Sequence, residues 1–247
     1  MDAILYIGHG SRTEAGNRQF AGFIGRTSSR VKAPIQEFAF LELAAPSIEQ
    51  GIGRCIERGA SRIIAMPVLL SSGIHALVDI PSALERAEDN FPEVEFVYGD
   101  VLSKGSGMAG ILAGKLAEKG FRSDGTEAVL LTGHGSRTDE SAKELEKLAE
   151  ELMDNQGSGT TVRTCYLKEA QPSYQDALGN LVQEPFDTIY ILPYLLFTGK
   201  FTERMEKTAA EVQRSSPSKN LVMCDPVGFD AGLEELLAGL AAAGDEA

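Results

Sequence analysis

The chain has 247 residues, 43% of them hydrophobic, which suits one large domain or two of ordinary size with a buried core. Its net charge of −13 argues against a nucleic-acid partner, because nucleic-acid binding needs a clustered basic face. The longest apolar runs are far too short to span a bilayer, and no basic region precedes the first one. We therefore expect a cytoplasmic protein with no signal peptide and no membrane partner.

The first half of the chain predicts alternating strands and helices. Each apolar run is followed by a turn and then by a helical pattern, and Pro34 and Gly59 mark two of the breaks. The expected strands lie at 3–7, 35–41, 63–70 and 94–98, and the expected helices at 13–31, 46–58, 75–90 and 108–119. This βαβαβαβα order predicts an α/β fold with a four-stranded parallel sheet covered by helices on both faces.

A polar, glycine-bearing segment at 120–126 separates this half from a second one. We place a domain boundary there, which gives domains at 1–120 and 126–247. The same order then returns, with strands expected at 127–132, 161–167, 187–193 and 220–224, and helices at 138–155, 172–183, 200–214 and 229–243.

The two halves share motifs as well as element order. The pentapeptide Gly-His-Gly-Ser-Arg occurs at 8–12 and again at 133–137, and these copies hold two of the three histidines in the chain. Further similar segments are 40–47 with 166–173 and 66–73 with 192–199, all at an offset of 125 or 126 positions. Motifs that stay in step over this distance indicate a duplicated half-chain.

His9, Glu42 and His75 are the candidate catalytic and metal-binding residues. They follow the first, second and third strands. If the first strand lies between the other two, as in flavodoxin-like sheets, neighbouring strand ends are only about 4.8 Å apart. Two imidazoles and a carboxylate would then form an N/N/O ligand set, open at one position and suited to a divalent transition metal. The same groups can accept protons near neutral pH.

The second half keeps only part of this set, so we expect a degenerate site there. His134 occupies the position equivalent to His9. Lys168 occupies the position equivalent to Glu42, and Phe201 the position equivalent to His75. A histidine in a glycine turn can also be structural, bonded to its own loop, and both interpretations stay open for His134. Glu169 can form a structural ion pair with Lys168.

Other sequence signals argue against alternative chemistry. A G-x-G-x-x-G match at 105–110 follows the fourth strand rather than the first, and the next strand ends without the acidic residue that a ribose needs, so we interpret it as a helix start. Ser11 lies in no G-x-S-x-G motif and is a poor candidate for a hydrolase nucleophile. Cys55, Cys165 and Cys224 have no C-x-x-C spacing, which argues against a disulfide framework or a cysteine zinc site.

The motifs together resemble a known family. The segments that carry the resemblance are 3–12, 40–43, 67–70 with His75 and 79–81, and 193–199. In this combination the chain resembles the class II tetrapyrrole chelatases, specifically the sirohydrochlorin chelatases of the SirB/CbiX type. The resemblance covers nearly the whole chain.

The resemblance implies two flavodoxin-like halves that face each other across a cleft and insert a divalent metal into sirohydrochlorin without ATP, as the last step to sirohaem. It implies that His9 and His75 bind the metal and help to remove the pyrrole protons, with Glu42 assisting. The metal is then a substrate, and no permanently bound cofactor is expected. Because some relatives are half-length homodimers, this fused duplication is expected to be a monomer.

Sirohydrochlorin carries many carboxylates, so polar and cationic groups near the strand ends are candidates for binding it. We expect this role for Ser11, Arg12, Ser72, His134, Arg137 and Lys168, with Lys200 as a further cation. Arg12 can equally lie on a solvated face. Fe²⁺ is the leading metal. The alternatives are a cobalt-inserting enzyme of cobalamin synthesis, Ni²⁺ as the metal, or a non-catalytic carrier of tetrapyrrole or metal.

Overall fold

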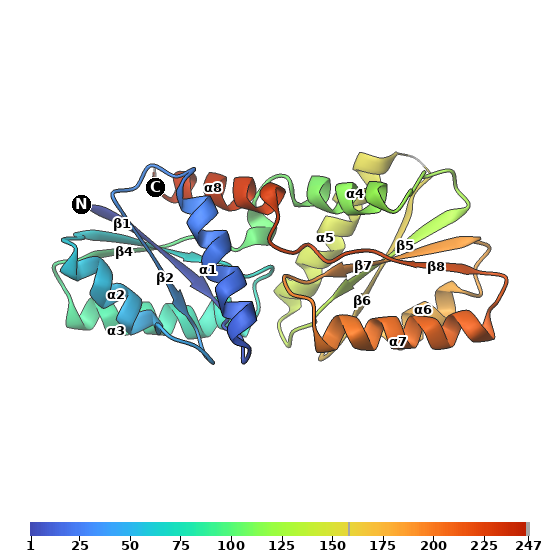
Figure 1. The fold of residues 1–247 in the computed structure, drawn as a ribbon, viewed down its shortest axis with the longest axis horizontal. Coiled ribbons are helices and arrows are strands. Elements are labelled where there is room, and N and C mark those ends of the chain that lie inside the picture. The colour runs from blue at the N-terminus through green and yellow to red at the C-terminus, as the bar shows by residue number, and fades with distance from the viewer. Residues whose placement is uncertain (158, 246–247) are drawn as a thin grey trace. The chain divides into compact units, whose positions relative to one another are not determined.

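The computed structural model describes residues 1–157 and 159–245, and strands and helices alternate along it as predicted (Figure 1). The strands are β1 (Asp2–Gly8), β2 (Ile35–Phe40), β3 (Arg62–Pro67), β4 (Glu95–Tyr98), β5 (Glu127–Gly133), β6 (Thr161–Tyr166), β7 (Thr188–Tyr194) and β8 (Asn220–Met223). The α-helices are α1 (Glu14–Ser28), α2 (Ile48–Glu57), α3 (Ile80–Asn90), α4 (Met108–Glu118), α5 (Asp139–Gln156), α6 (Tyr174–Leu181), α7 (Lys200–Ser215) and α8 (Ala231–Asp245). A π-helix, η1 (His75–Asp79), leads into α3, and a 3-10 helix, η2 (Leu102–Lys104), precedes α4.

Differences from the predicted boundaries lie at the ends of elements. α1 ends at Ser28 rather than Val31, and β3 ends at Pro67 rather than Leu70. The last residue of β3 that pairs with β1 is Pro67, opposite Ile7, one residue before β1 itself ends. Thr13 is the N-cap of α1, since its side chain accepts a hydrogen bond from the backbone N–H of Gly16 at 3.2 Å.

The first sheet has the strand order β2-β1-β3-β4, and every pair is parallel. β1 therefore lies between β2 and β3, as the flavodoxin-like arrangement requires. Gly8 pairs with Phe40 on one side, and Ile7 pairs with Pro67 on the other. The carboxyl ends of these three strands consequently meet at one edge of the sheet.

The second sheet repeats this arrangement with the order β6-β5-β7-β8, again all parallel. Gly133 at the end of β5 pairs with Tyr166, just as Gly8 pairs with Phe40. The predicted fold class, two duplicated four-stranded parallel sheets with helices, is confirmed. The duplication includes strand register as well as sequence motifs.

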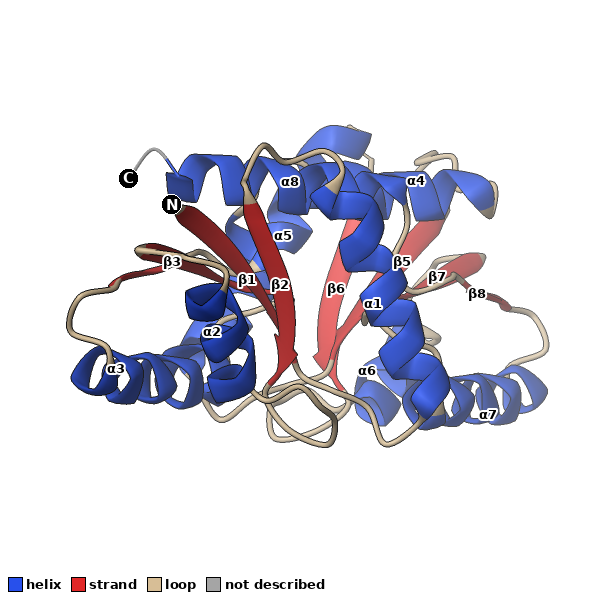
Figure 2. Cartoon of the chain, turned by 60° about the vertical axis from the view of Figure 1, so that its left-hand side comes forward, coloured by secondary structure: helices blue, strands red, loops and turns tan. Residues whose placement is uncertain are grey.

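Helices cover both faces of the first sheet. Leu5 and Ile7 belong to a core cluster with side chains of α2 and α3, whereas Ile64 of β3 lies next to Gly244 of α8 on the other face. Figure 2 shows α2 and α3 on one side of these strands and α8 on the opposite side. Since both faces are covered, β1 is continuously buried from Ala3 to Gly8, which explains its unbroken apolar run.

The compact units of the structure are not the two sequence halves. One unit comprises Met1–Ser106 with Phe229–Ala247, and the other comprises Gly107–Gly228. These compact units differ from the predicted domains at 1–120 and 126–247 in their last helices. α4 packs on α5 and β7 of the second unit, and α8 packs on α1 and β3 of the first.

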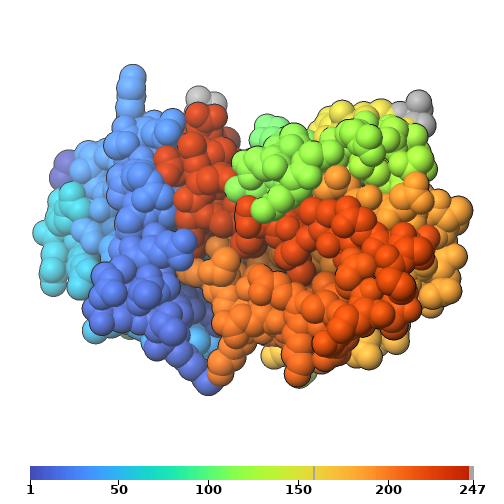
Figure 3. Space-filling model, turned by 45° about the vertical axis from the view of Figure 1, so that its right-hand side comes forward, coloured from blue at the N-terminus to red at the C-terminus, as the bar shows by residue number. Residues whose placement is uncertain are grey.

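This exchange is visible in the colour sequence of the space-filling view, where the red C-terminal helix lies against the blue N-terminal segment (Figure 3). Its physical basis is that each last helix has an apolar face, and the sequence pattern does not specify which sheet covers that face. Among the described residues, no helix combines the length and the hydropathy that a membrane span requires.

Candidate metal-binding site

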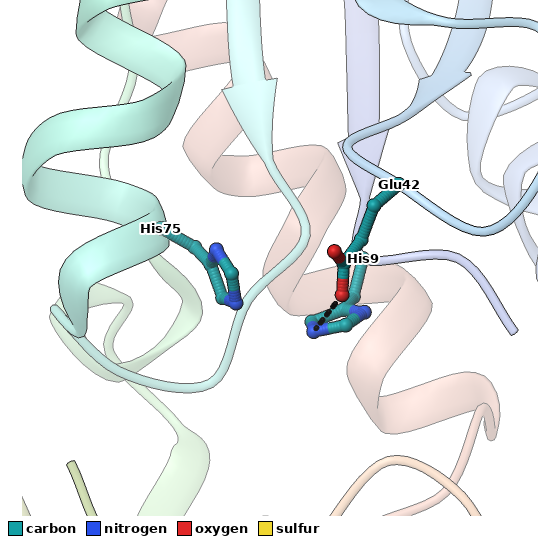
Figure 4. A group of neighbouring side chains, drawn as sticks. All are labelled: His9, Glu42 and His75. Atoms are coloured by element: carbon teal, nitrogen blue, oxygen red, sulfur yellow. Dashed lines mark ion pairs between the residues drawn. The ribbon is translucent and has the colours of Figure 1, made fainter.

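Three predicted residues meet at the carboxyl edge of the first sheet. His9 directly follows β1, Glu42 lies two residues after β2, and His75 opens η1 in the segment that follows β3. Figure 4 shows the three side chains directed toward one another from these separate elements. The strand order brings them together, since β1 is the neighbour of both β2 and β3.

The distances suit a shared metal ion. His9 Nε2 lies 3.5 Å from Glu42 Oε1, and the His9 and His75 ring centroids are 4.8 Å apart at an interplanar angle of 88°. One ligand atom from each residue lies within 4.8 Å of the other two. The side chains are 40%, 51% and 40% exposed for His9, Glu42 and His75, so the potential ligand atoms are open to an incoming ion.

A glycine turn fixes the spacing between His9 and Glu42. The Glu42 backbone N–H donates to the His9 carbonyl at 3.1 Å, which extends the pairing of β1 with β2 by one step. Gly10 has φ of +93°, and a Cβ on it would lie 1.9 Å from the Glu42 carbonyl oxygen. Only glycine fits this position, because both the backbone conformation and the close approach exclude a side chain.

The remaining contacts of the two rings leave one nitrogen of each available. His9 Nδ1 lies 3.3 Å from the Gly10 carbonyl oxygen, and His75 Nδ1 lies 2.7 Å from Asp79 Oδ2. For His75, the carboxylate accepts, so the contact favours the proton on Nδ1 and leaves the Nε2 lone pair for a metal. For His9, Nδ1 faces a carbonyl oxygen and Nε2 faces Glu42 Oε1, so a metal bound between Nε2 and the carboxylate would leave the proton on Nδ1. Asp79 was not among the predicted site residues, although it lies four residues after His75 in a predicted helix, a spacing that places the two side chains on one face.

The other predicted substrate-binding residues of the first unit, Ser11, Arg12 and Ser72, differ in their exposure and in their hydrogen bonds. The Ser11 hydroxyl accepts from the Thr13 backbone N–H at 3.1 Å and lies 3.0 Å from Thr13 Oγ1, so it helps to shape the start of α1. Arg12, on the same loop, is exposed and forms no ion pair with the described part of the chain. Ser72 is only 7% exposed.

The second unit repeats the geometry of the site without its ligands. The rings of His134 and Phe201 are 4.9 Å apart at 87°, which closely reproduces the His9–His75 pair. Lys168 Nζ lies 5.2 Å from the Phe201 ring centroid, where its cation can interact with the ring. His134 Nδ1 lies 3.0 Å from the Gly135 carbonyl oxygen, the same loop contact that His9 makes.

The ion pair considered for Glu169 and Lys168 is replaced by another one in the structure. Glu169 pairs with Arg137, with 3.1 Å between Arg137 Nε and Glu169 Oε2, rather than with its sequence neighbour Lys168. Glu169 has φ of +58°, in the left-handed region. Residues adjacent in sequence therefore have different partners here, Arg137 for Glu169 and the Phe201 ring for Lys168.

Within residues 1–157 and 159–245, His9, Glu42 and His75 are the group of His, Cys, Asp or Glu side chains with metal-binding geometry. The cysteines are buried, and burial raises the pKa of the Cys55, Cys165 and Cys224 thiols to about 12. Thiols with so high a pKa stay protonated at neutral pH and are poor metal ligands. The available ligand set is therefore N/N/O.

Comparisons with known proteins agree with this architecture. The CbiX family model matches residues 3–119 and 128–242. The sirohydrochlorin ferrochelatase of Priestia megaterium is 35% identical over 237 residues, covering 96% of this chain and 88% of the relative. The sirohydrochlorin cobaltochelatase of the same organism is 28% identical over 241 residues, covering 96% and 78%. The structure of SirB from Bacillus subtilis with Fe³⁺ superposes with a TM-score of 0.91 at 28% identity, covering 99% of this chain and 97% of SirB.

Proposed function

Because the chain belongs to the CbiX family, we propose that it is a sirohydrochlorin ferrochelatase, which inserts Fe²⁺ into sirohydrochlorin without ATP. The observation that carries the proposal is the convergence of His9, Glu42 and His75, whose ligand atoms lie within 4.8 Å of one another. Two relatives named sirohydrochlorin ferrochelatase match over 96% and 92% of the chain, so the proposal concerns the full protein rather than one half.

The proposed chemistry exchanges two pyrrole protons for one divalent ion. His9 Nε2, His75 Nε2 and a Glu42 oxygen hold the ion, and the partly exposed arrangement leaves coordination positions for the macrocycle nitrogens. As the ion moves to the macrocycle, the released imidazoles and carboxylate accept the pyrrole protons and pass them to solvent. The side chains that release the ion thus accept the protons that the macrocycle loses. In this proposal the exchange proceeds without hydrolysis of a nucleotide.

The residues beside the ligands support a large, partly apolar substrate. Leu43, Ile74 and Leu77 are 48%, 40% and 47% exposed, which is unusual for large apolar side chains, and they flank Glu42 and His75 in sequence. They offer an apolar surface to the face of a tetrapyrrole ring. Arg12, exposed on the His9 loop, is the proposed partner of a peripheral carboxylate.

The roles of the second unit are part of the same proposal. His134, Arg137 and Lys168 lie at the equivalent edge of the second sheet, and we propose them as contacts to the carboxylates of the substrate. They lack a ligand set of their own. A monomeric chain and a cytoplasmic location stay predictions from the sequence.

Cobalt is the second candidate metal, because a relative named a cobaltochelatase also matches over 96% of the chain. The ferrochelatase relative is more similar, at 35% against 28% identity, and this difference favours iron. Ligand chemistry alone does not distinguish the metals, since an N/N/O site binds Co²⁺ and Ni²⁺ at least as tightly as Fe²⁺.

An insertion assay tests the proposal. Purified protein is mixed anaerobically with sirohydrochlorin and with Fe²⁺, Co²⁺ or Ni²⁺ in separate reactions, and the absorption change of the macrocycle is followed. We expect insertion of Fe²⁺ well above the rate without protein. A rate equal to the spontaneous reaction for every metal would reject the enzyme and leave a carrier of metal or tetrapyrrole.

A further inference from the structure

We propose that Asp79 is a positioning residue that holds the His75 ring in the orientation and tautomer needed to bind the metal. This inference rests on the proposed function only in taking His75 as a ligand. The supporting observation is the contact of 2.7 Å between His75 Nδ1 and Asp79 Oδ2. An ionised carboxylate can only accept, so the proton resides on Nδ1, and Nε2 presents its lone pair to the site.

The two histidines of the site are held in different ways. His9 Nδ1 has a longer contact of 3.3 Å to the neutral carbonyl of Gly10, within its own rigid glycine turn. His75 lies at the beginning of a helix and contacts the His9 ring edge-on, and the two side chains are equally exposed, at 40%. The difference between them is therefore the partner of Nδ1, which for His75 is a charged carboxylate at short distance.

The backbone between His75 and Asp79 supports the pair. Both residues belong to the π-helical turn η1, which is closed by a hydrogen bond from the Ile80 N–H to the His75 carbonyl. Tyr98 of β4 donates from its hydroxyl to the Ala76 carbonyl at 2.7 Å and so ties the turn to the first sheet. π-helical turns are rare and occur frequently at functional sites.

The second unit provides an internal comparison. There Phe201 occupies the place of His75, and the position four residues later, which corresponds to Asp79, is Met205. Met205 is fully buried in the apolar core of that unit. The half that has no second imidazole thus also has no carboxylate at this spacing, as expected if Asp79 serves His75 rather than the helix.

The test uses the full-length chain with Asp79→Ala, Asp79→Glu and the control Asp89→Ala. Asp89 is an exposed carboxylate at the other end of α3, so its removal changes the net charge equally. Two readouts need no sirohydrochlorin: the His75 tautomer from ¹⁵N NMR, and Co²⁺ affinity from its visible absorption. They remain informative even if the chain proves not to insert metal, and thermal unfolding checks that each variant is folded.

We expect Asp79→Ala to increase the population of His75 protonated on Nε2 and to weaken Co²⁺ binding by about 10- to 100-fold, a range typical for partners of metal-ligating histidines. Asp79→Glu should restore most of the affinity, and Asp89→Ala should leave both readouts unchanged. The proposal is overturned if folded Asp79→Ala protein keeps the wild-type tautomer and affinity, or if Asp79→Glu binds as weakly as Asp79→Ala.

Discussion

Gly10 shows how a glycine can determine the position of a candidate metal ligand, here Glu42. Its φ of +93° and the approach of its Cα to the Glu42 carbonyl allow the loops after β1 and β2 to touch. Gly135 repeats this arrangement, with φ of +88° and the Lys168 carbonyl in place of that of Glu42. Both copies of the pentapeptide therefore have glycine at this position, whereas the residue opposite it is acidic in one copy and basic in the other.

We predict that Gly10→Ala weakens Co²⁺ binding roughly tenfold or more, because the added Cβ, 1.9 Å from the Glu42 carbonyl oxygen, displaces a ligand-bearing loop. The strained backbone alone should lower the free energy of unfolding by about 1–2 kcal/mol. Calorimetric titration and urea denaturation measure the two effects. Gly135→Ala, with its Cβ 1.8 Å from the Lys168 carbonyl oxygen, is the matched control and should lose stability alone. Equal metal affinity in the two variants would contradict this account.

At the scale of elements, α8 is attached to the first unit by a buried charge. Glu234 is 5% exposed and accepts from Arg26 Nε at 2.5 Å and from Arg30 Nη2 at 3.4 Å, both arginines lying on or just beyond α1. Its neighbour Glu235 pairs with the same Arg30 at 3.5 Å, but the Glu235 side chain is 71% exposed. The two glutamates thus differ mainly in solvation.

We predict that Glu234→Ala lowers the free energy of unfolding by about 1.5–3 kcal/mol, the range for hydrogen bonds to charged groups. Glu235→Ala should cost less than about 1 kcal/mol, because an exposed ion pair is screened by water. Urea denaturation of both variants provides the measurement. A loss for Glu235→Ala as large as that for Glu234→Ala would show that the contact between α8 and α1 does not depend on the buried carboxylate.

For the molecule as a whole, element order and the convergence of the three candidate ligands could be predicted because they depend on local patterns and on one topological rule. Apolar runs define the strands, and placing the first strand between the second and third brings His9, Glu42 and His75 to one edge. The exchange of α4 and α8 could not be predicted in this way. The pattern of an amphipathic helix indicates that one face is buried against another element. It does not indicate which of the two sheets that element belongs to, because this depends on tertiary packing.

The exchange makes fragments sensitive to where the chain is cut. We predict that residues 107–228 alone unfold cooperatively, whereas 121–247 do not, because the second fragment loses α4. Met108, Leu112 and Leu116 of α4 are buried, and burying each contributes about 1.5–3 kcal/mol. Their sum is comparable with the total stability of about 5–15 kcal/mol of a typical domain. Urea denaturation followed by circular dichroism measures this, and equal cooperativity of the two fragments would contradict the assignment of α4 to the second unit.

Of the two geometrically similar sites, we propose that the one with His9 and His75, and not the one with His134, performs the chemistry. The most direct measurement is the rate of Fe²⁺ insertion into sirohydrochlorin by His9→Ala, His75→Ala and His134→Ala proteins of verified fold. We predict losses of roughly 100-fold or more for His9→Ala and His75→Ala, since each removes a metal ligand and a proton acceptor, and a smaller loss for His134→Ala. If His134→Ala were the most impaired of the three, the reacting centre would belong to the second unit and the account would be wrong.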